Sequence, residues 1–180
     1  AFDRDLRACA DWVSDYLRNI GGRVEQIHDY GRPIVYAEFA AGAGKPTVLL
    51  YGHYDVQPAN DRSLWPQDPF EPRIDGRRLV ARGASDNKGP FMAYLAALEV
   101  CRAAGRLPVN VKIVLEGEEE SSGRAIFDLV EKQTARLKCD LVVSTDASGF
   151  FPGQPAITYG TRGLVYKQID LYGPRQDLHS

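Results

Sequence analysis

Apolar residues follow two spacings along the chain, one typical of helices and one typical of buried strands. Near the N-terminus they recur every three or four positions up to Leu17, which predicts a helix that ends at Gly21. Further helices are expected at 90–103 and 124–137. Strands are expected at 24–28, 34–39, 47–51, 109–115, 141–144, 156–159 and 164–172.

This alternation of strands and helices predicts an α/β domain. The expected architecture is a three-layer αβα sandwich, with helices on both faces of a mainly parallel sheet. The proline-rich segment 60–78 has no periodic pattern, so we expect a long loop at the rim of a site, carrying Trp65 and Phe70.

The strand at 47–51 runs into His53 and Asp55, which are two residues apart. Side chains at i and i+2 of a strand point to the same side, so these two can share one pocket. Imidazoles that bind metals usually donate their second N–H to a carboxylate, which suits this pair. A purely structural His–Asp hydrogen bond would give the same spacing.

Asp86 lies between Gly83 and Gly89, just before the helix expected at 90–103. It could bind a ligand in a tight glycine turn or simply cap that helix. A phosphate-binding loop is excluded, because Gly89 follows Lys88 where that motif requires Ser or Thr.

Acidic residues also follow two later strands. The strand at 109–115 leads into Glu116, Glu118, Glu119 and Glu120, and the strand at 141–144 leads into Asp146. Ligands of α/β folds gather at the carboxyl ends of strands, and adjacent glutamates repel one another unless a cation is near. A solvated face and a simple turn are the alternatives for these two segments.

Taken together, these segments offer nitrogen and oxygen donors at comparable points of successive strand–loop units. That donor chemistry suits a catalytic zinc ion, or manganese or cobalt, better than a closed structural site. The candidate ligands are His53, Asp86, Glu119 or Glu120, and Asp146.

The segments GHYDVQP, RGASDNKG, EGEEESSG and VVSTDAS resemble, in order and spacing, the co-catalytic dinuclear zinc peptidase family. That family includes carnosinase and other cytosolic dipeptidases, carboxypeptidase G, and the acetylornithine and succinyl-diaminopimelate deacylases. The likeness covers essentially the whole chain. It implies the first half of a zinc exopeptidase-like catalytic domain with a mixed sheet.

The resemblance also implies a role for each site residue. Asp86 would bridge two metal ions, and the Asp86–Asn87 peptide bond would be cis. Asp55 would hold His53, and Glu119 would be the general acid/base. The remaining metal ligands would be His53, Asp146 and Glu120, while His179 would reach the substrate carbonyl.

One departure affects the glutamates. Relatives usually read E-E-x-G-S in this segment, where E-E is the glutamate pair, whereas Ser121-Ser122-Gly123 follows the pair here. We keep Glu119 as the base and Glu120 as the ligand, with Glu118 as the alternative if the register differs.

These roles imply hydrolysis of an amide bond by a water held between two Zn²⁺ ions, with Glu119 taking its proton. The expected substrate is a dipeptide, as for a dipeptidase or carboxypeptidase. An N-acyl amino acid deacylase and a non-catalytic metal-binding domain are the alternatives.

The resemblance places 1–172 in the catalytic domain and 173–180 at the start of a lid domain through which relatives form homodimers. Relatives continue to a last histidine ligand that this chain lacks. We therefore expect a fragment that is inactive by itself.

Composition is consistent with this interpretation. The net charge of −2 gives no reason to expect nucleic acid or an anionic membrane as a partner. The sequence contains no apolar run of about 18 residues, so no membrane-spanning helix is expected. Three scattered cysteines (Cys9, Cys101 and Cys139) are interpreted as core thiols and favour a reducing, cytoplasmic location.

Overall fold

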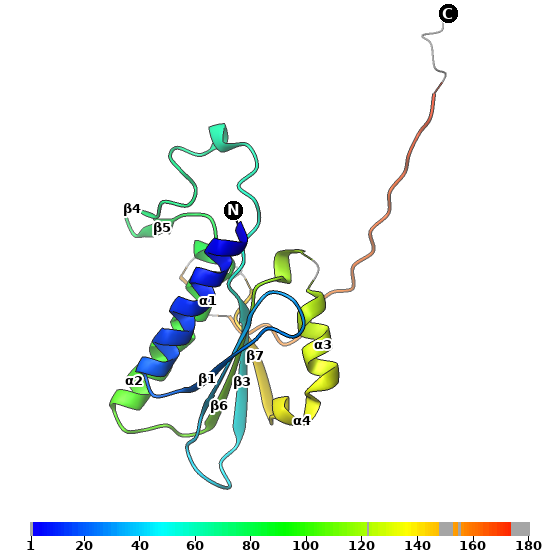
Figure 1. Ribbon diagram of the computed structural model, residues 1–180. Helices are drawn as coiled ribbons and strands as arrows, with labels where there is room; N and C mark the ends of the chain where they lie inside the picture. The colour runs from blue at the N-terminus through cyan, green and yellow to red at the C-terminus, as the bar shows by residue number, and fades with distance from the viewer. Residues whose placement is uncertain (1, 122, 148–152, 155, 174–180) are drawn as a thin grey trace, which may run out of the picture. The chain divides into compact units, whose positions relative to one another are not determined.

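A computed structural model of the 180-residue chain describes residues 2–121, 123–147, 153–154 and 156–173 (Figure 1). The chain divides into two units, Ala1–Asp146 and Ala147–Ser180. All the regular secondary structure of the described residues lies in the first unit.

The first unit is built on a five-stranded mixed sheet with the order β1-β2-β6-β3-β7. β3 pairs in parallel with both β6 and β7, whereas β2 is antiparallel to β1 and β6. β2 therefore runs against the other four, which confirms the mixed, mainly parallel sheet. The strands are β1 (Arg23–Ile27), β2 (Ile34–Phe39), β3 (Thr47–His53), β6 (Asn110–Glu116) and β7 (Leu141–Ser144).

Helices cover both faces of this sheet, as the three-layer prediction requires (Figure 1). α1 (Phe2–Asn19) and α2 (Gly89–Ala103) pack on one face, where Ile113 and Leu115 of β6 meet their apolar side chains. α3 (Arg124–Lys132) and α4 (Thr134–Leu137) lie on the other face, where Val114 packs with Leu129. The period-2 alternation of β6 therefore divides its apolar residues between two cores.

Two helix and loop predictions need correction. The helix expected at 124–137 is split into α3 and α4, because Gln133 has non-helical backbone angles. The segment 60–78 contains the short helix η1 (Arg62–Leu64) and β4 (Arg73–Asp75), which pairs with β5 (Arg78–Val80). Gly76, with a φ of 60°, provides the tight turn that the β4–β5 hairpin needs.

The strands predicted at 156–159 and 164–172 are wrong. The described residues of the second unit contain no helix or strand, and Ile157 and Tyr166 are 92% and 89% exposed. Residues with strand propensity form a strand only when a neighbouring strand takes up their main-chain hydrogen bonds. Residues 174–180, most of the expected lid segment, lie outside the described residues.

The central strand β6 provides a test of this packing. Ile113 is fully buried between β6 and the α1–α2 layer. Ile113→Ala should lower the free energy of unfolding by about 2–5 kcal/mol, because it leaves a cavity in the core. Urea denaturation measures this loss.

Val100→Ala is the control, since Val100 lies on α2 but is 68% exposed. It should change the unfolding free energy by less than about 0.5 kcal/mol. Equal losses in the two variants would contradict the core assignment.

Candidate metal centre

His53 is the last residue of β3 and its side chain is fully buried. The parallel register places it opposite Glu116, the last residue of β6. The preceding residue, Gly52, allows a neighbouring turn to approach the strand closely. A Cβ at this position would lie 2.8 Å from Asn87 Oδ1, so even an alanine would displace that turn.

Carboxylates from three other segments surround the Nε2 atom of His53. Asp86 Oδ1 lies 3.0 Å away and Asp146 Oδ2 lies 3.3 Å away. Glu119 Oε2 follows at 3.9 Å. Asp86 belongs to turn η2 (Ala84–Lys88), Asp146 follows β7, and Glu119 begins η3 (Glu119–Ser121). Residues remote in sequence thus meet at one imidazole nitrogen.

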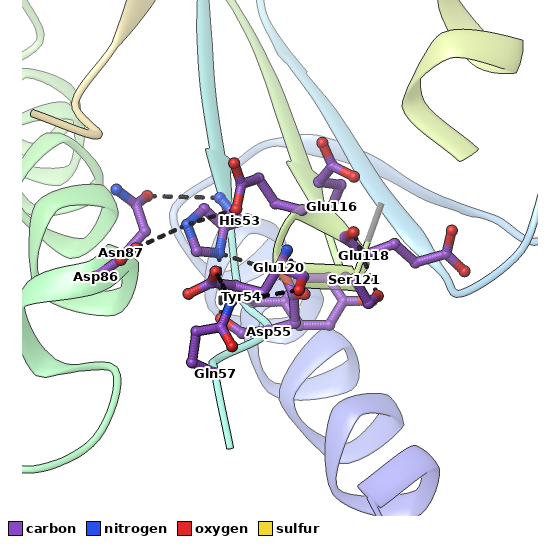
Figure 2. A network of polar contacts seen from close by, with 12 residues as sticks. His53, Tyr54, Asp55, Gln57, Asp86, Asn87, Glu116, Glu118, Glu120 and Ser121 are labelled. Carbon is purple, nitrogen blue, oxygen red and sulfur yellow. Dashed lines mark hydrogen bonds and ion pairs between the residues drawn. The ribbon is translucent and has the colours of Figure 1, made fainter. Parts of the chain in front are cut away.

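The other ring nitrogen of His53 faces Asp55, as Figure 2 shows. Nδ1 lies 3.1 Å from the main-chain oxygen of Asp55 and 3.3 Å from its Oδ1. When Nδ1 carries the proton and donates a hydrogen bond to the main-chain oxygen of Asp55, Nε2 keeps its lone pair for a metal. The second carboxylate oxygen of Asp55 accepts the N–H of Glu120 at 3.0 Å, which links the histidine to η3.

Turn η2 contacts the end of β3 through its buried side chain. Asn87 is fully buried and its Oδ1 accepts the main-chain N–H of His53 at 3.5 Å (Figure 2). The Asp86–Asn87 peptide bond is cis, as the resemblance implied.

The three successive glutamates point to three different places. Glu118 Oε1 accepts the main-chain N–H of Arg32 at 2.9 Å, and its carboxylate is turned away from His53 (Figure 2). Glu119 faces His53, and Glu120 Oε2 accepts a hydrogen bond of 2.7 Å from Gln57. The structure therefore separates Glu118, the alternative base, from the histidine.

The donor set of this centre fits a metal ion. One ligand atom each from His53, Asp86 and Asp146 lie within 4.8 Å of one another. A nitrogen and two carboxylate oxygens at this spacing suit zinc and similar divalent ions. Glu120 is not a member of this three-residue group, and His179 lies outside the described residues.

The electrostatics of the centre reflect its crowded carboxylates. Burial lowers the pKa of His53, but the neighbouring Asp55, Glu119 and Asp146 outweigh it and raise the pKa to about 9. Burial also raises the pKa of Glu119, and the nearby Glu120 and Asp146 add to this rise. A cation among these groups would relieve the repulsion between the carboxylates.

Sequence reasoning assigned no role to Glu116, although its position carried a signal. It follows Val114 by two residues on an apolar strand, so it faces the same interior. Its Oε1 accepts the Tyr51 hydroxyl at 2.5 Å, and its Oε2 has no partner among the described residues. Burial raises the pKa of Glu116 to about 7.

A model of the Peptidase family M20/M25/M40 matches residues 49–163, which include every site segment from His53 to Asp146. The chain belongs to this family. The Beta-Ala-His dipeptidase of Mus musculus is 41% identical to this M20 chain over 184 residues. The Cys-Gly metallodipeptidase of Schizosaccharomyces pombe is 34% identical over 186 residues.

These matches cover 93% and 95% of the M20 chain but only 37% and 39% of the two curated relatives. Among solved structures, an M20 family metallo-carboxypeptidase from Sulfolobus solfataricus has a TM-score of 0.74 and 40% identity. That match covers 79% of this chain and 32% of the other. The M20 chain therefore spans well under half the length of these relatives.

Among its described residues, no helix is long and apolar enough to cross a membrane.

Glu116 gives a pH-dependent prediction for the metal-free protein. Its folded-state pKa is raised from 4.5 to about 7, so between these pH values the folded state holds a proton that the unfolded state has lost. This term therefore lowers stability as pH rises through that window, on the order of 1–3 kcal/mol in total. Glu116→Gln should remove it, so the variant gains stability relative to the parent at pH 8 but not at pH 4.

Urea denaturation with a chelator present, repeated across this pH range, measures the difference between the two proteins. A difference that does not change with pH would contradict a raised pKa at Glu116.

Proposed function

We propose that this chain is the N-terminal part of a metal-dependent hydrolase of peptide bonds, with a dipeptide as the substrate. The observation that supports this most directly is the meeting of His53, Asp86 and Asp146 at one point. Two relatives that cover nearly the whole chain are named as dipeptidases, and one of them as a metallodipeptidase. Because the chain spans only 37–39% of those relatives, the activity belongs to the longer protein.

Zinc is the ion we propose for this centre, with manganese or cobalt as alternatives. His53, Asp86 and Asp146 would hold one ion. Asp86 and Glu120 would begin the site of a second, which needs a further ligand from outside this chain. When bound, two such ions lower the pKa of a water and polarise the scissile carbonyl.

Glu119 is the proposed general base. Its carboxylate faces the donor group and is 40% exposed, so a water and a substrate can reach it. Burial and neighbouring carboxylates raise its pKa, which brings a carboxyl group closer to the neutral range in which it both accepts and returns a proton. It would take the proton of the attacking water and pass it to the departing amine nitrogen.

Asp55 supports this chemistry from behind the centre. It contacts the His53 ring at Nδ1 and accepts the N–H of Glu120, so one residue orients both a ligand and the turn that carries the base. Contacts of this kind fix the direction of a ligating imidazole and strengthen its binding.

An N-acyl amino acid deacylase of the same family and a non-catalytic metal-binding domain are the other candidates. The relatives reported above favour the dipeptidase. Contact of His179 with the substrate, homodimer formation by the longer protein and a cytoplasmic location stay predictions from the sequence.

Zinc binding tests the centre in the chain itself. The parent chain should bind one zinc ion tightly, and His53→Ala should weaken that affinity ~100-fold or more because one of three protein ligands is lost. Competition with a chromogenic chelator measures both affinities. His28→Ala is the matched control, since His28 is exposed and forms no hydrogen bond or ion pair within the described part of the chain; it should bind zinc as the parent does.

The role of Glu119 requires the longer protein, obtained by extending this chain to the full length of its relatives. Glu119→Gln should lower kcat for dipeptide hydrolysis by about 10²–10⁴-fold, the usual contribution of a general base, while the metal content stays unchanged. Steady-state kinetics and metal analysis on the same samples measure the two effects.

Glu118→Gln is the control for this experiment, because the neighbouring Glu118 binds the main chain of Arg32 instead. It should retain activity. If Glu118→Gln loses turnover and Glu119→Gln keeps it, the two glutamates exchange roles. A metal-loaded parent that hydrolyses no dipeptide would favour a deacylase or a non-catalytic domain.

A further inference from the structure

Turn η2 places Asp86 against the buried His53, although Asp86 itself is not held by packing. The Asp86 side chain is 61% exposed, yet its Oδ1 lies 3.0 Å from His53 Nε2. An exposed carboxylate keeps such a position only when the main chain that carries it is fixed. The candidates for fixing it are the residues of the same turn that bind their surroundings, and Asn87 does so through the N–H of His53.

Lys88, two residues after Asp86, makes the contacts that such a role requires. Its ammonium donates a hydrogen bond to the main-chain oxygen of Tyr54, the residue that follows His53. It also lies 3.3 Å from the Sγ atom of Cys9 on α1. One side chain thus joins the turn of Asp86, the end of the His53 strand and the first helix.

The ammonium of Lys88 serves this main-chain contact. Lys88 is half-buried and forms no ion pair with a carboxylate in the part of the chain that the structure describes. Its charge is directed at a main-chain carbonyl beside a metal ligand. A partly desolvated ammonium needs such a hydrogen bond, so the contact with Tyr54 is costly to break.

Gly83 lets the turn fold closely against its neighbours. A Cβ at Gly83 would lie 2.5 Å from a methyl group of Val56, and the φ of Gly83 is 85°, so a larger residue would displace the turn. The same Cβ would lie 3.4 Å from Lys88 Cε, which is ordinary van der Waals contact. The Lys88 N–H donates to the Gly83 oxygen at 3.0 Å, which closes the turn around Asp86.

We infer that Lys88 is a positioning residue for the metal centre: its ammonium, bound to the Tyr54 carbonyl, holds turn η2 so that Asp86 meets His53 at the ion. The inference rests on the metal centre of the proposed function. Lys88 touches neither ion nor substrate and acts through the main chain on both sides of the centre. Breaking its contact therefore weakens metal binding before it weakens the fold.

The test compares two lysines that both donate to main-chain carbonyls. Lys88→Met keeps an unbranched side chain about as long as the lysine stem and removes the ammonium. Lys112→Met does the same on β6, where Lys112 donates to the main-chain oxygens of Arg136 and Lys138, residues that are not part of the metal centre. Zinc affinity of the 180-residue chain is measured by chelator competition, and stability by thermal unfolding of the metal-free chain.

Lys88→Met should weaken zinc affinity by about 10–100-fold, the usual effect of losing a residue that orients metal ligands. Lys112→Met should lower the stability of the metal-free chain about as much as Lys88→Met does, but it should leave zinc affinity unchanged. Cobalt substitution adds a spectroscopic readout, since a displaced Asp86 changes the visible absorption of the bound ion in Lys88→Met alone. Equal affinities for Lys88→Met and the parent, or an equal loss in both variants, would overturn the inference.

Lys88→Arg provides the test if Lys88→Met does not fold. It keeps a cation at this position, but the guanidinium is wider and planar and donates in a different geometry, so zinc affinity should fall by about threefold or more. If Lys88→Arg binds zinc as tightly as the parent, the inference about Lys88 is contradicted but the proposed metal centre is not. A parent chain that binds no zinc would overturn both the proposed function and this inference.

Discussion

The parallel pairing of β3 with β6 is the constraint on which the metal centre depends. It brings His53 and Glu116 to the same end of the sheet, where the parallel strands finish, and the pairing of β3 with β7 adds the segment that carries Asp146. Because parallel strands finish at the same end, the loops that follow them lie side by side and their polar side chains come together. The antiparallel strands β1 and β2 extend the sheet on the side away from β7.

At this end of the sheet, the side chains of the metal centre differ in their exposure to solvent. The ring of His53 is fully buried and is held from behind by Asp55, whereas the carboxylates in front of it are partly exposed. This asymmetry fits a centre that must hold an ion firmly and still admit a water and a substrate. The donor group lies entirely within the first unit of the chain, so its geometry needs only the packing of that unit.

The periodic apolar pattern predicted the five strands of the main sheet and the helices on both of its faces, whereas the mixed strand directions were implied by the family resemblance. The polar residues of the site follow strands or lie in a glycine turn, so local sequence indicated them without knowledge of the strand order. The partners of Lys88 and Gln57 could not be predicted, because Tyr54 and Glu120 become their neighbours only when the loops converge. The strands expected at 156–159 and 164–172 failed for the opposite reason, since strand propensity does not supply a pairing strand.

The loop that carries Glu119 is held by contacts at the residues before and after it. Arg32 binds the Glu118 carboxylate and Asp55 binds the main chain of Glu120, so the loop is fastened on both sides of Glu119. Exchange of Gly and Ser beyond Ser121 leaves both fastenings in place. Insertion or deletion of a single residue between them would instead rotate each carboxylate into its neighbour's position. The position of Glu119 therefore depends on the number of residues between the two contacts more than on the residues that follow them.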